Sequence, residues 1–138
     1  MAQSSLSVTV KTAGGSVVIM LVGELDMSNA DRLRDDLAHA SRVHHGAGII
    51  VDASKLTFLD SIGIRVLVES AKQIRGQGHA WHLEGATGIP LTALQVTGVY
   101  EYLAASPGTR AGSPAKPRWW RRLFSRAAHK KTATSDRK

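Results

Sequence analysis

A serine that directly follows an aspartate marks the most informative stretch of the chain. Asp60, Ser61, Ile62 and Gly63 lie between a predicted strand and the start of a predicted helix. The first N–H groups of a helix have no partner within it, so the Ser61 hydroxyl can cap the helix, a contact worth ~1 kcal/mol. The same hydroxyl can also be presented at the surface. Gly63 has no Cβ and would let another chain come close. The stretch therefore suits a surface contact as well as a helix cap.

The other polar residues do not form a recognisable catalytic or metal site. His79 and His82 are three residues apart in a predicted strand, so their side chains point to opposite faces and cannot easily share a metal ion. The sequence has no Gly-x-Ser-x-Gly turn of the kind that an α/β hydrolase needs. It also has no Gly-x-Gly-x-x-Gly or Walker phosphate loop. We therefore predict no catalytic residue, no metal site and no cofactor, and we do not expect an enzyme.

Charge is unevenly distributed along the chain. The formal net charge is +7 over 138 residues, yet positions 1–106 hold eight Lys or Arg and ten Asp or Glu. The other ten basic residues follow Pro107, where Asp136 is the one acidic residue. This asymmetry indicates a mildly acidic domain followed by a basic arm.

The expected location of the protein follows from features that the sequence lacks. It contains no cysteine, which excludes a disulfide framework and a thiolate metal site. Its first residues do not have the basic start and apolar stretch of a signal peptide. No apolar run approaches the ~20 residues that a membrane-spanning helix needs. We therefore expect a cytoplasmic protein.

Strand and helix patterns alternate on both sides of Ser61. Period-2 alternation predicts a strand at 6–11, apolar runs predict buried strands at 17–22 and 47–52, and a further strand is expected at 79–84. Helical spacing predicts helices beginning near Ser28, at 60–61 and at 87, with Ser28 and Asp31 in the spacing of a capping box. A last short strand is expected at 99–100. This order predicts an α/β fold, with a mixed sheet of four or five strands packed with helices.

A Pro-, Gly- and Ser-rich stretch separates this domain from the arm. We predict a single domain over 1–105, a flexible linker over 106–117 and a basic aromatic tail over 118–138. Part of the tail would form a short amphipathic helix, with Trp120, Leu123, Phe124 and Ala127 on one face. The candidate binding residues of the tail are Arg118, Trp119, Trp120, Arg121, Arg122, Phe124 and Arg126.

Four roles remain open for this tail. Basic residues beside Trp and Phe suit an anionic membrane surface, which is the role we place first. The tail could also be a disordered arm that favours solubility, or a helix that docks on the domain. Cations with stacking aromatic rings suit single-stranded nucleic acid as well, and we place that role last.

Several motifs together resemble the STAS domain family, the fold shared by anti-sigma factor antagonists and the cytoplasmic parts of sulfate transporters. The resemblance spans about residues 6–103. It rests on Gly23-Glu24-Leu25-Asp26, on Leu33-Arg34 and Leu37, and above all on Phe58-Leu59-Asp60-Ser61-Ile62-Gly63.

The resemblance implies which residues would act. In the family, the serine after the aspartate is phosphorylated by a partner anti-sigma kinase, and by position that serine is Ser61. The docking surface implied for this chain comprises Asp26, Ser28, Asp60, Ser61, Ile62 and Gly63. Ile62 is bulkier than the small residue that many members have at this position. Asp26 has a second interpretation, as an acid that favours the dipole of the following helix.

The implied function is that of a bacterial anti-sigma factor antagonist, which regulates transcription indirectly by partner switching. The unphosphorylated chain would bind an anti-sigma factor with serine kinase activity, and a phosphatase would reverse the modification. One alternative is a STAS subunit of a membrane lipid-transport ABC complex. Another is a nucleic-acid-binding adaptor that works through the tail. The tail would provide any association with the inner surface of the membrane.

Overall fold

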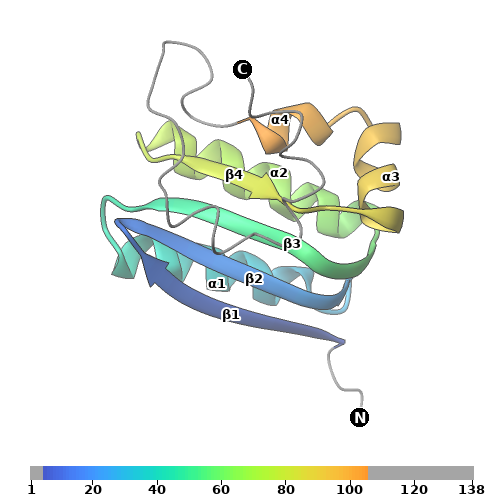
Figure 1. Cartoon of the computed structure of the whole chain (residues 1–138), viewed down its shortest axis with the longest axis horizontal. Helices are drawn as coiled ribbons and strands as arrows, with labels where there is room; N and C mark the ends of the chain where they lie inside the picture. Colours follow the sequence, from blue (N-terminus) through green and yellow to red (C-terminus); the bar gives the residue numbers. More distant parts are fainter. Residues whose placement is uncertain (1–4, 106–138) are drawn as a thin grey trace.

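The computed structural model describes residues 5–105, which form one α/β unit (Figure 1). Its elements follow in the order β1 (Leu6–Ala13), β2 (Ser16–Leu25), α1 (Ala30–Val43), β3 (Gly48–Leu59), α2 (Ser61–Gly76), β4 (Trp81–Glu84), α3 (Gly88–Val96) and α4 (Tyr100–Ala104). The predicted linker and tail lie outside the described residues, so their boundaries stay predictions.

The sheet is mixed and has the strand order β1-β2-β3-β4, which confirms the predicted fold class. β1 pairs antiparallel with β2, whereas β2, β3 and β4 run parallel to one another. The hairpin between β1 and β2 closes through Gly14 and Gly15, which have φ angles of +55° and +85°. Two successive positive φ angles match the right-handed twist of a hairpin and favour glycine at both positions.

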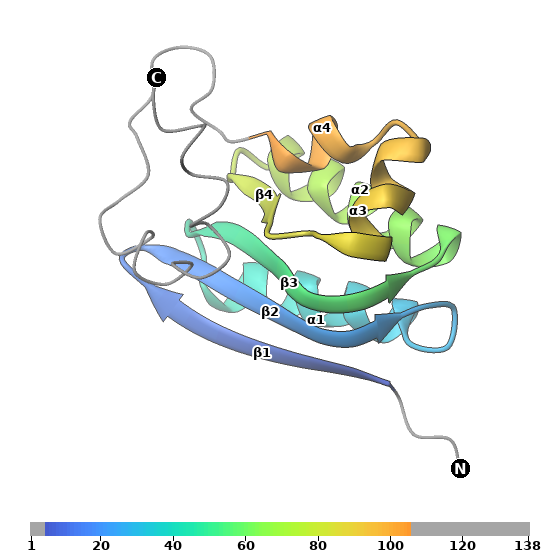
Figure 2. The ribbon, with the colours of Figure 1, turned by 45° about the vertical axis from the view of Figure 1, so that its right-hand side comes forward.

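Helices α1 and α2 lie side by side on one face of the sheet (Figures 1 and 2). The side chains between these helices and the sheet form the core, which includes Val17, Ile19, Leu21, Leu33, Leu37, Ile49, Val51, Val66, Leu67, Trp81 and Leu83. Trp81 is fully buried there and donates its indole N–H to Oγ of Ser70 at 3.1 Å. This bond pairs the two polar groups in the core, so neither is left unsatisfied.

Helix α4 replaces the short strand that was expected at 99–100. The N–H of Val99 donates to the carbonyl of Leu94, and the N–H of Leu103 donates to the carbonyl of Val99. Leu103 is fully buried and belongs to the core. The expectation of a strand was wrong because two adjacent apolar residues carry no period, and burial of Leu103 one helical turn later favours the helix.

Two strands differ in length from the expectation. β3 continues seven residues beyond Asp52 because β2 stays paired with it as far as Leu25 and Leu59, through two shifts of register. β4 begins only at Trp81, because the N–H of His79 donates to the carbonyl of Ile74 in the turn that follows α2. Within residues 5–105, no helix is both long and apolar enough to cross a bilayer.

Candidate docking site

The candidate site lies where β2 and β3 end side by side. Leu25 and Leu59 are the last residues of these parallel strands and are register partners. The loop from β2 to α1 and the start of α2 therefore meet at one end of the sheet (Figure 2). The Met27 N–H donates to the Asp60 carboxylate, so the loop that carries Asp26 and Ser28 lies against the start of α2, where Ser61 is.

Asp60 joins the two segments with both of its carboxylate oxygens. Oδ1 accepts the N–H of Gly63 at 2.8 Å, and Oδ2 accepts the N–H of Met27 at 3.1 Å. The Asp60 N–H itself donates to the carbonyl of Leu25 at 3.2 Å. Asp60 is thus the N-cap of α2, and its second oxygen fastens the β2–α1 loop to the helix start.

Ser61 is the first residue of α2 and is exposed. The cap is supplied by Asp60, so the interpretation of Ser61 as the capping residue was wrong. Among the described residues the Ser61 hydroxyl forms no hydrogen bond. From the sequence, Ser61 could both cap the helix and present its hydroxyl at the surface. In the structure Asp60 caps the helix, and the Ser61 hydroxyl is available at the surface.

The β2–α1 loop is held by Asp26 and by the buried Asn29. Oδ1 of Asp26 accepts both the N–H of Ser28 at 2.9 Å and its hydroxyl at 2.6 Å. Asn29 accepts the Asp26 N–H through Oδ1 at 3.0 Å and donates through Nδ2 to the carbonyl of Glu24 at 3.0 Å. These bonds fix a tight turn in which the carboxylate of Asp26 is half-buried and already engaged.

The predicted capping box of α1 is absent. Asn29 occupies the N-cap position without a side-chain cap bond, and the hydroxyl of Ser28 donates to Asp26 instead. Asp31 pairs with Arg34 at 2.9 Å. Asn29 was missed by the sequence interpretation, although an asparagine directly before Ala30 is itself a typical N-cap signal.

Gly63 is buried, and its missing side chain serves packing within the chain. A Cβ at this position would lie 2.7 Å from Cγ of Leu25 and 3.0 Å from Cδ1 of Leu59. The close approach that the glycine permits is therefore between α2 and the ends of β2 and β3. The sequence interpretation, in which Gly63 lets another chain come close, is therefore corrected. Gly63 instead lets the start of α2 pack closely on the strand ends, and this packing positions the site.

Three large apolar side chains around Ser61 are exposed. Met27 in the β2–α1 loop is 72% exposed, Phe58 near the end of β3 is 39% exposed, and Ile62 is 36% exposed. Each comes from a different segment, so no periodic pattern links them in the sequence. Of the three, only Ile62 was predicted as a contact residue, and a methionine amid the polar residues 26–29 was the one signal for Met27.

The histidines do not gather at this site. His79 stacks edge-to-face with His45 at a centroid distance of 6.0 Å, whereas His82 lies in β4 with its Nε2 3.5 Å from a Glu84 oxygen. In the described part of the chain, no three His, Asp or Glu side chains are placed to hold a metal ion. The tail residues Arg118, Trp119, Trp120, Arg121, Arg122, Phe124 and Arg126 lie outside the described range.

Comparison with known proteins points to one family. The chain is 24% identical over 108 residues to the anti-sigma-B factor antagonist of Bacillus subtilis, covering 78% of this chain and 97% of that protein. Among solved structures it resembles an anti-sigma factor antagonist from Mycobacterium paratuberculosis, with a TM-score of 0.66, 19% identity and coverage of 78% and 91% of the two chains. The Bacillus cell fate determinant SpoIIAA in its phosphorylated form has a TM-score of 0.57, 20% identity and coverage of 72% and 89%. A family model for the STAS domain matches residues 7–110, so the chain belongs to the STAS domain family.

Proposed function

We propose that this chain is an anti-sigma factor antagonist that binds its partner through the surface around Ser61. The partner is an anti-sigma factor with serine kinase activity, and phosphorylation of Ser61 ends the binding. The observation that carries the proposal is the exposed Ser61 hydroxyl, which makes no hydrogen bond within the described residues because Asp60 supplies the helix cap. The names of the relatives in the family support the same role.

The proposed docking surface combines a polar centre with apolar surroundings. Ser61 and Ser28 are exposed and Asp26 is half-buried, while Met27, Phe58 and Ile62 offer apolar area around them. Burying such area on a partner contributes ~25 cal/mol per Å² before the costs of association. Asp60 and Gly63 hold this surface in place without forming its outer face.

A phosphate on Ser61 affects the fold and the complex differently. It adds about −1.5 to −2 charges at the start of α2, where the helix dipole favours a negative group by ~0.3–1 kcal/mol. Folding should therefore survive the modification. In a tight interface the same group has to be desolvated beside Asp26 and Asp60. A cost of ~3 kcal/mol there lowers the affinity more than about a hundredfold.

In the proposed cycle of phosphorylation and dephosphorylation, other proteins catalyse both reactions. The partner kinase brings ATP and transfers the phosphoryl group to Oγ of Ser61, and a phosphatase removes it. This chain contributes the acceptor hydroxyl and the surface that places it, and it acts as a binding module of the cytoplasm.

The test uses three baits: the wild-type chain, Ser61→Ala and Ser61→Asp. Partners captured from the host lysate are identified by mass spectrometry, then purified and incubated with ATP and each bait. An ATP-binding anti-sigma protein should bind the first two baits and not the third. It should phosphorylate the wild type and a Ser28→Ala control, but not Ser61→Ala. Recovery of a transport ATPase would favour the lipid-transport alternative. Identical partners on all three baits would show that Ser61 is not a switch.

A further inference from the structure

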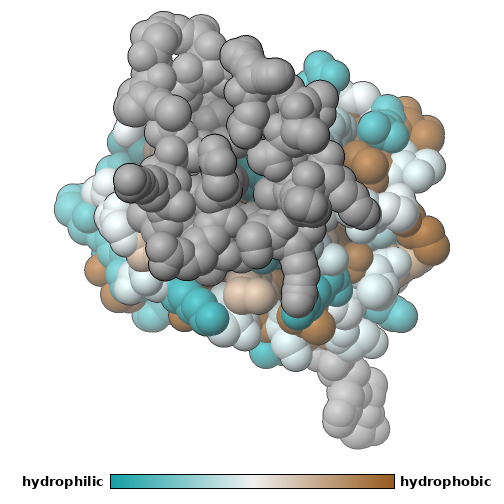
Figure 3. Space-filling view, in the orientation of Figure 1, coloured by the Kyte–Doolittle hydropathy of each residue, from teal (hydrophilic) through white to brown (hydrophobic). Residues whose placement is uncertain are grey.

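The sheet has one open edge, which is formed by strand β1. β1 is the first strand in the order β1-β2-β3-β4, and it pairs with β2 on one side only. Most of its residues are exposed, including Val10 at 44%. β1 runs along the lower rim of the molecule in Figure 1, and the surface there mixes hydrophobic with hydrophilic residues (Figure 3). Among the elements of residues 5–105, β2 is the one with which β1 makes its main contacts.

Every second residue of β1 turns its backbone N–H and C=O groups away from β2. The N–H of Glu24 donates to the carbonyl of Ser5 at 3.0 Å, so Ser5 is bonded toward β2. Bonded and non-bonded positions alternate in an antiparallel pair, and the register of β1 with β2 has no shift. The backbone groups of Val8, Val10 and Thr12 therefore point outward, where a further strand could pair with them.

The side chains of β1 give this edge one apolar face and one polar face. Val8 and Val10 lie on the face that carries α1 and α2, because their register partners in β2 are core residues. Val8 packs against the core, and Val10 extends beyond it. Ser7, Thr9 and Lys11 alternate with the valines and are exposed on the other face. A strand added here would therefore contact valines on one face and polar side chains on the other.

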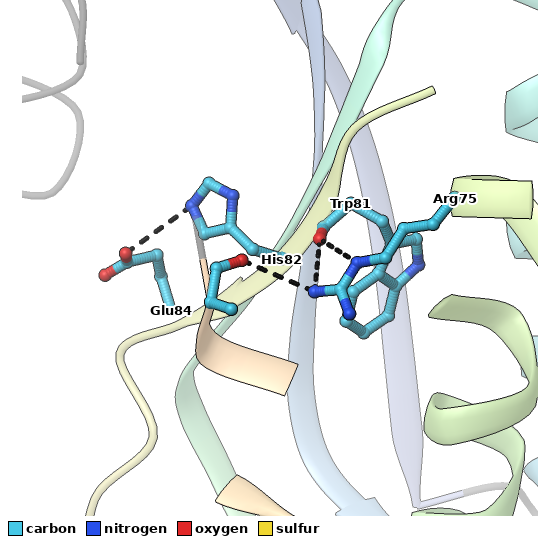
Figure 4. Close-up of polar contacts among 5 residues, drawn as sticks. Arg75, Trp81, His82 and Glu84 are labelled. Atoms are coloured by element: carbon cyan, nitrogen blue, oxygen red, sulfur yellow. Dashed lines mark hydrogen bonds and ion pairs between the residues drawn. The ribbon is translucent and has the colours of Figure 1, made fainter. Parts of the chain in front are cut away.

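The opposite edge of the sheet is closed. β4 has only four residues, and α4 packs beside it. The guanidinium of Arg75 donates to the carbonyl of Trp81 through Nε at 3.1 Å and through Nη2 at 2.8 Å (Figure 4). Nη2 also donates to the carbonyl of Tyr102 at 3.0 Å, which fastens α4 at this edge. Pairing through strand edges can therefore join two copies of the chain, and the sheet has no second open edge from which to continue.

β1 also lacks the features that usually keep an edge strand from pairing. Natural edge strands are commonly short, bulged, interrupted by proline or rich in charge. β1 has eight residues, contains no proline and has Lys11 as its one charged residue. Its pairing with β2 is continuous from Leu6 to Ala13. The strand is therefore suited to pair with another strand along its length.

We propose that β1 of a second copy of this chain pairs antiparallel with β1, about a two-fold axis at Thr9. Val8 of each copy then lies opposite Val10 of the other in a hydrogen-bonded pair. Thr9 faces its own counterpart, and Lys11 lies opposite Ser7, so the two lysines stay apart. This is the register in which all the valines of β1 oppose valines. A shift of one residue would place them opposite the polar face.

The paired copies would keep both proposed docking surfaces accessible. The axis joins the two sheets into one, with α1 and α2 of both copies on the same face. Because the copies run antiparallel, Ser61 of one copy lies at the opposite end of the joined sheet from Ser61 of the other. The dimer therefore presents two separate Ser61 surfaces. Its formation does not depend on the proposed antagonist function.

Single cysteines in the full chain test the register. The sequence has no cysteine, so Thr9→Cys places one thiol in each chain. At a non-hydrogen-bonded position of an antiparallel pair the Cα atoms lie ~4.5 Å apart, within the range of a disulfide. Thr9→Cys should therefore form a covalent dimer under mild oxidation, whereas Lys11→Cys or Ser7→Cys alone should stay largely uncrosslinked. A mixture of the Ser7→Cys and Lys11→Cys chains should crosslink, because these positions lie opposite each other.

Charges at position 9 test the same contact without a covalent bond. Sedimentation equilibrium of the wild-type chain should give the mass of two chains. Thr9→Glu and Thr9→Lys should each weaken the association about tenfold or more, because like charges then face each other across the axis. An equimolar mixture of the two variants should restore it. Thr9 is exposed, so the melting temperatures of both variants should stay close to that of the wild type.

Two results would overturn the proposal. A wild-type chain that sediments with the mass of one chain would show that the β1 edge does not pair with a second copy. A dimer that persists unchanged in both Thr9→Glu and Thr9→Lys would show that the contact between copies lies elsewhere.

Discussion

The carboxylate of Asp60 accepts the backbone N–H of Met27, a residue 33 positions earlier in the chain. The same carboxylate caps α2 through the N–H of Gly63. One side chain thus sets the helix start and the loop that faces it, so the positions of Ser61 and Met27 on the proposed surface depend on each other.

Removing this carboxylate should loosen both segments. Asp60→Ala takes away the N-cap, which costs ~0.5–2 kcal/mol, and it leaves the Met27 N–H to solvent. We expect the free energy of unfolding in urea to fall by about 1–2 kcal/mol. Ser61→Ala is the matched control, since its exposed hydroxyl holds nothing in the fold and its effect should stay within ~0.5 kcal/mol. Equal losses in the two variants would mean that Ser61 shares the capping role.

A side chain at position 63 should destabilise the domain. In Gly63→Ala the new Cβ lies 2.7 Å from Cγ of Leu25, so α2 or the end of β2 has to move. Overpacking of this kind costs ~1–3 kcal/mol. Gly76→Ala near the other end of α2 is the control, because no atom lies within 4 Å of its added Cβ and alanine favours a helix by up to ~1 kcal/mol. Chemical unfolding of both variants should give changes of opposite sign, and an unchanged Gly63→Ala would show that Leu25 moves aside without cost.

Charges placed in the apolar part of the proposed surface should weaken the partner without affecting the fold. Met27→Asp and Ile62→Asp change exposed side chains, so their melting temperatures should stay close to that of the wild type. Each should lower the affinity for the captured anti-sigma partner about tenfold or more, the effect of ~1.4 kcal/mol. Val96→Asp introduces the same charge at a 79% exposed position on α3 and should bind normally. Titration by calorimetry separates these outcomes, and normal binding by both site variants would place the interface elsewhere.

The sequence was sufficient to predict elements whose burial is periodic. The apolar run at 17–22 and the stripe of α2 identified β2 and the second helix, because one buried face of a strand or helix leaves a repeat in the chain. The second half of β3 left no such repeat. Its polar residues Ser54, Lys55 and Thr57 hide a strand that exists because β2 continues beside it.

The sequence alone named Asp60, Ser61 and Gly63 as residues of the candidate site, but it did not show which of them caps the helix or what Gly63 packs against. Asp60 and Ser61 are both typical capping residues, and local spacing does not choose between them. In the structure Asp60 is the cap, through the N–H of Gly63, and its other oxygen accepts the N–H of Met27, a residue far away in the sequence. Gly63 is a similar case, since the atoms that would contact its Cβ come from Leu25 and Leu59 at the ends of two strands.

Alkaline pH should destabilise the domain through Tyr100 at the start of α4. Burial raises the pKa of the Tyr100 phenol above its ordinary 10.0, and the carboxylates of Glu84 and Glu101 raise it further. Above about pH 10 the unfolded chain loses this proton before the folded chain does, so the unfolded state binds fewer protons and the stability falls as the pH rises. Below about pH 10 the phenol is protonated in both states, and its contribution is constant.

The free energy of unfolding in urea, measured from about pH 8 to 11, should decline less steeply for Tyr100→Phe than for the wild type. Parallel slopes for the wild type and Tyr100→Phe would show that other groups cause the alkaline loss.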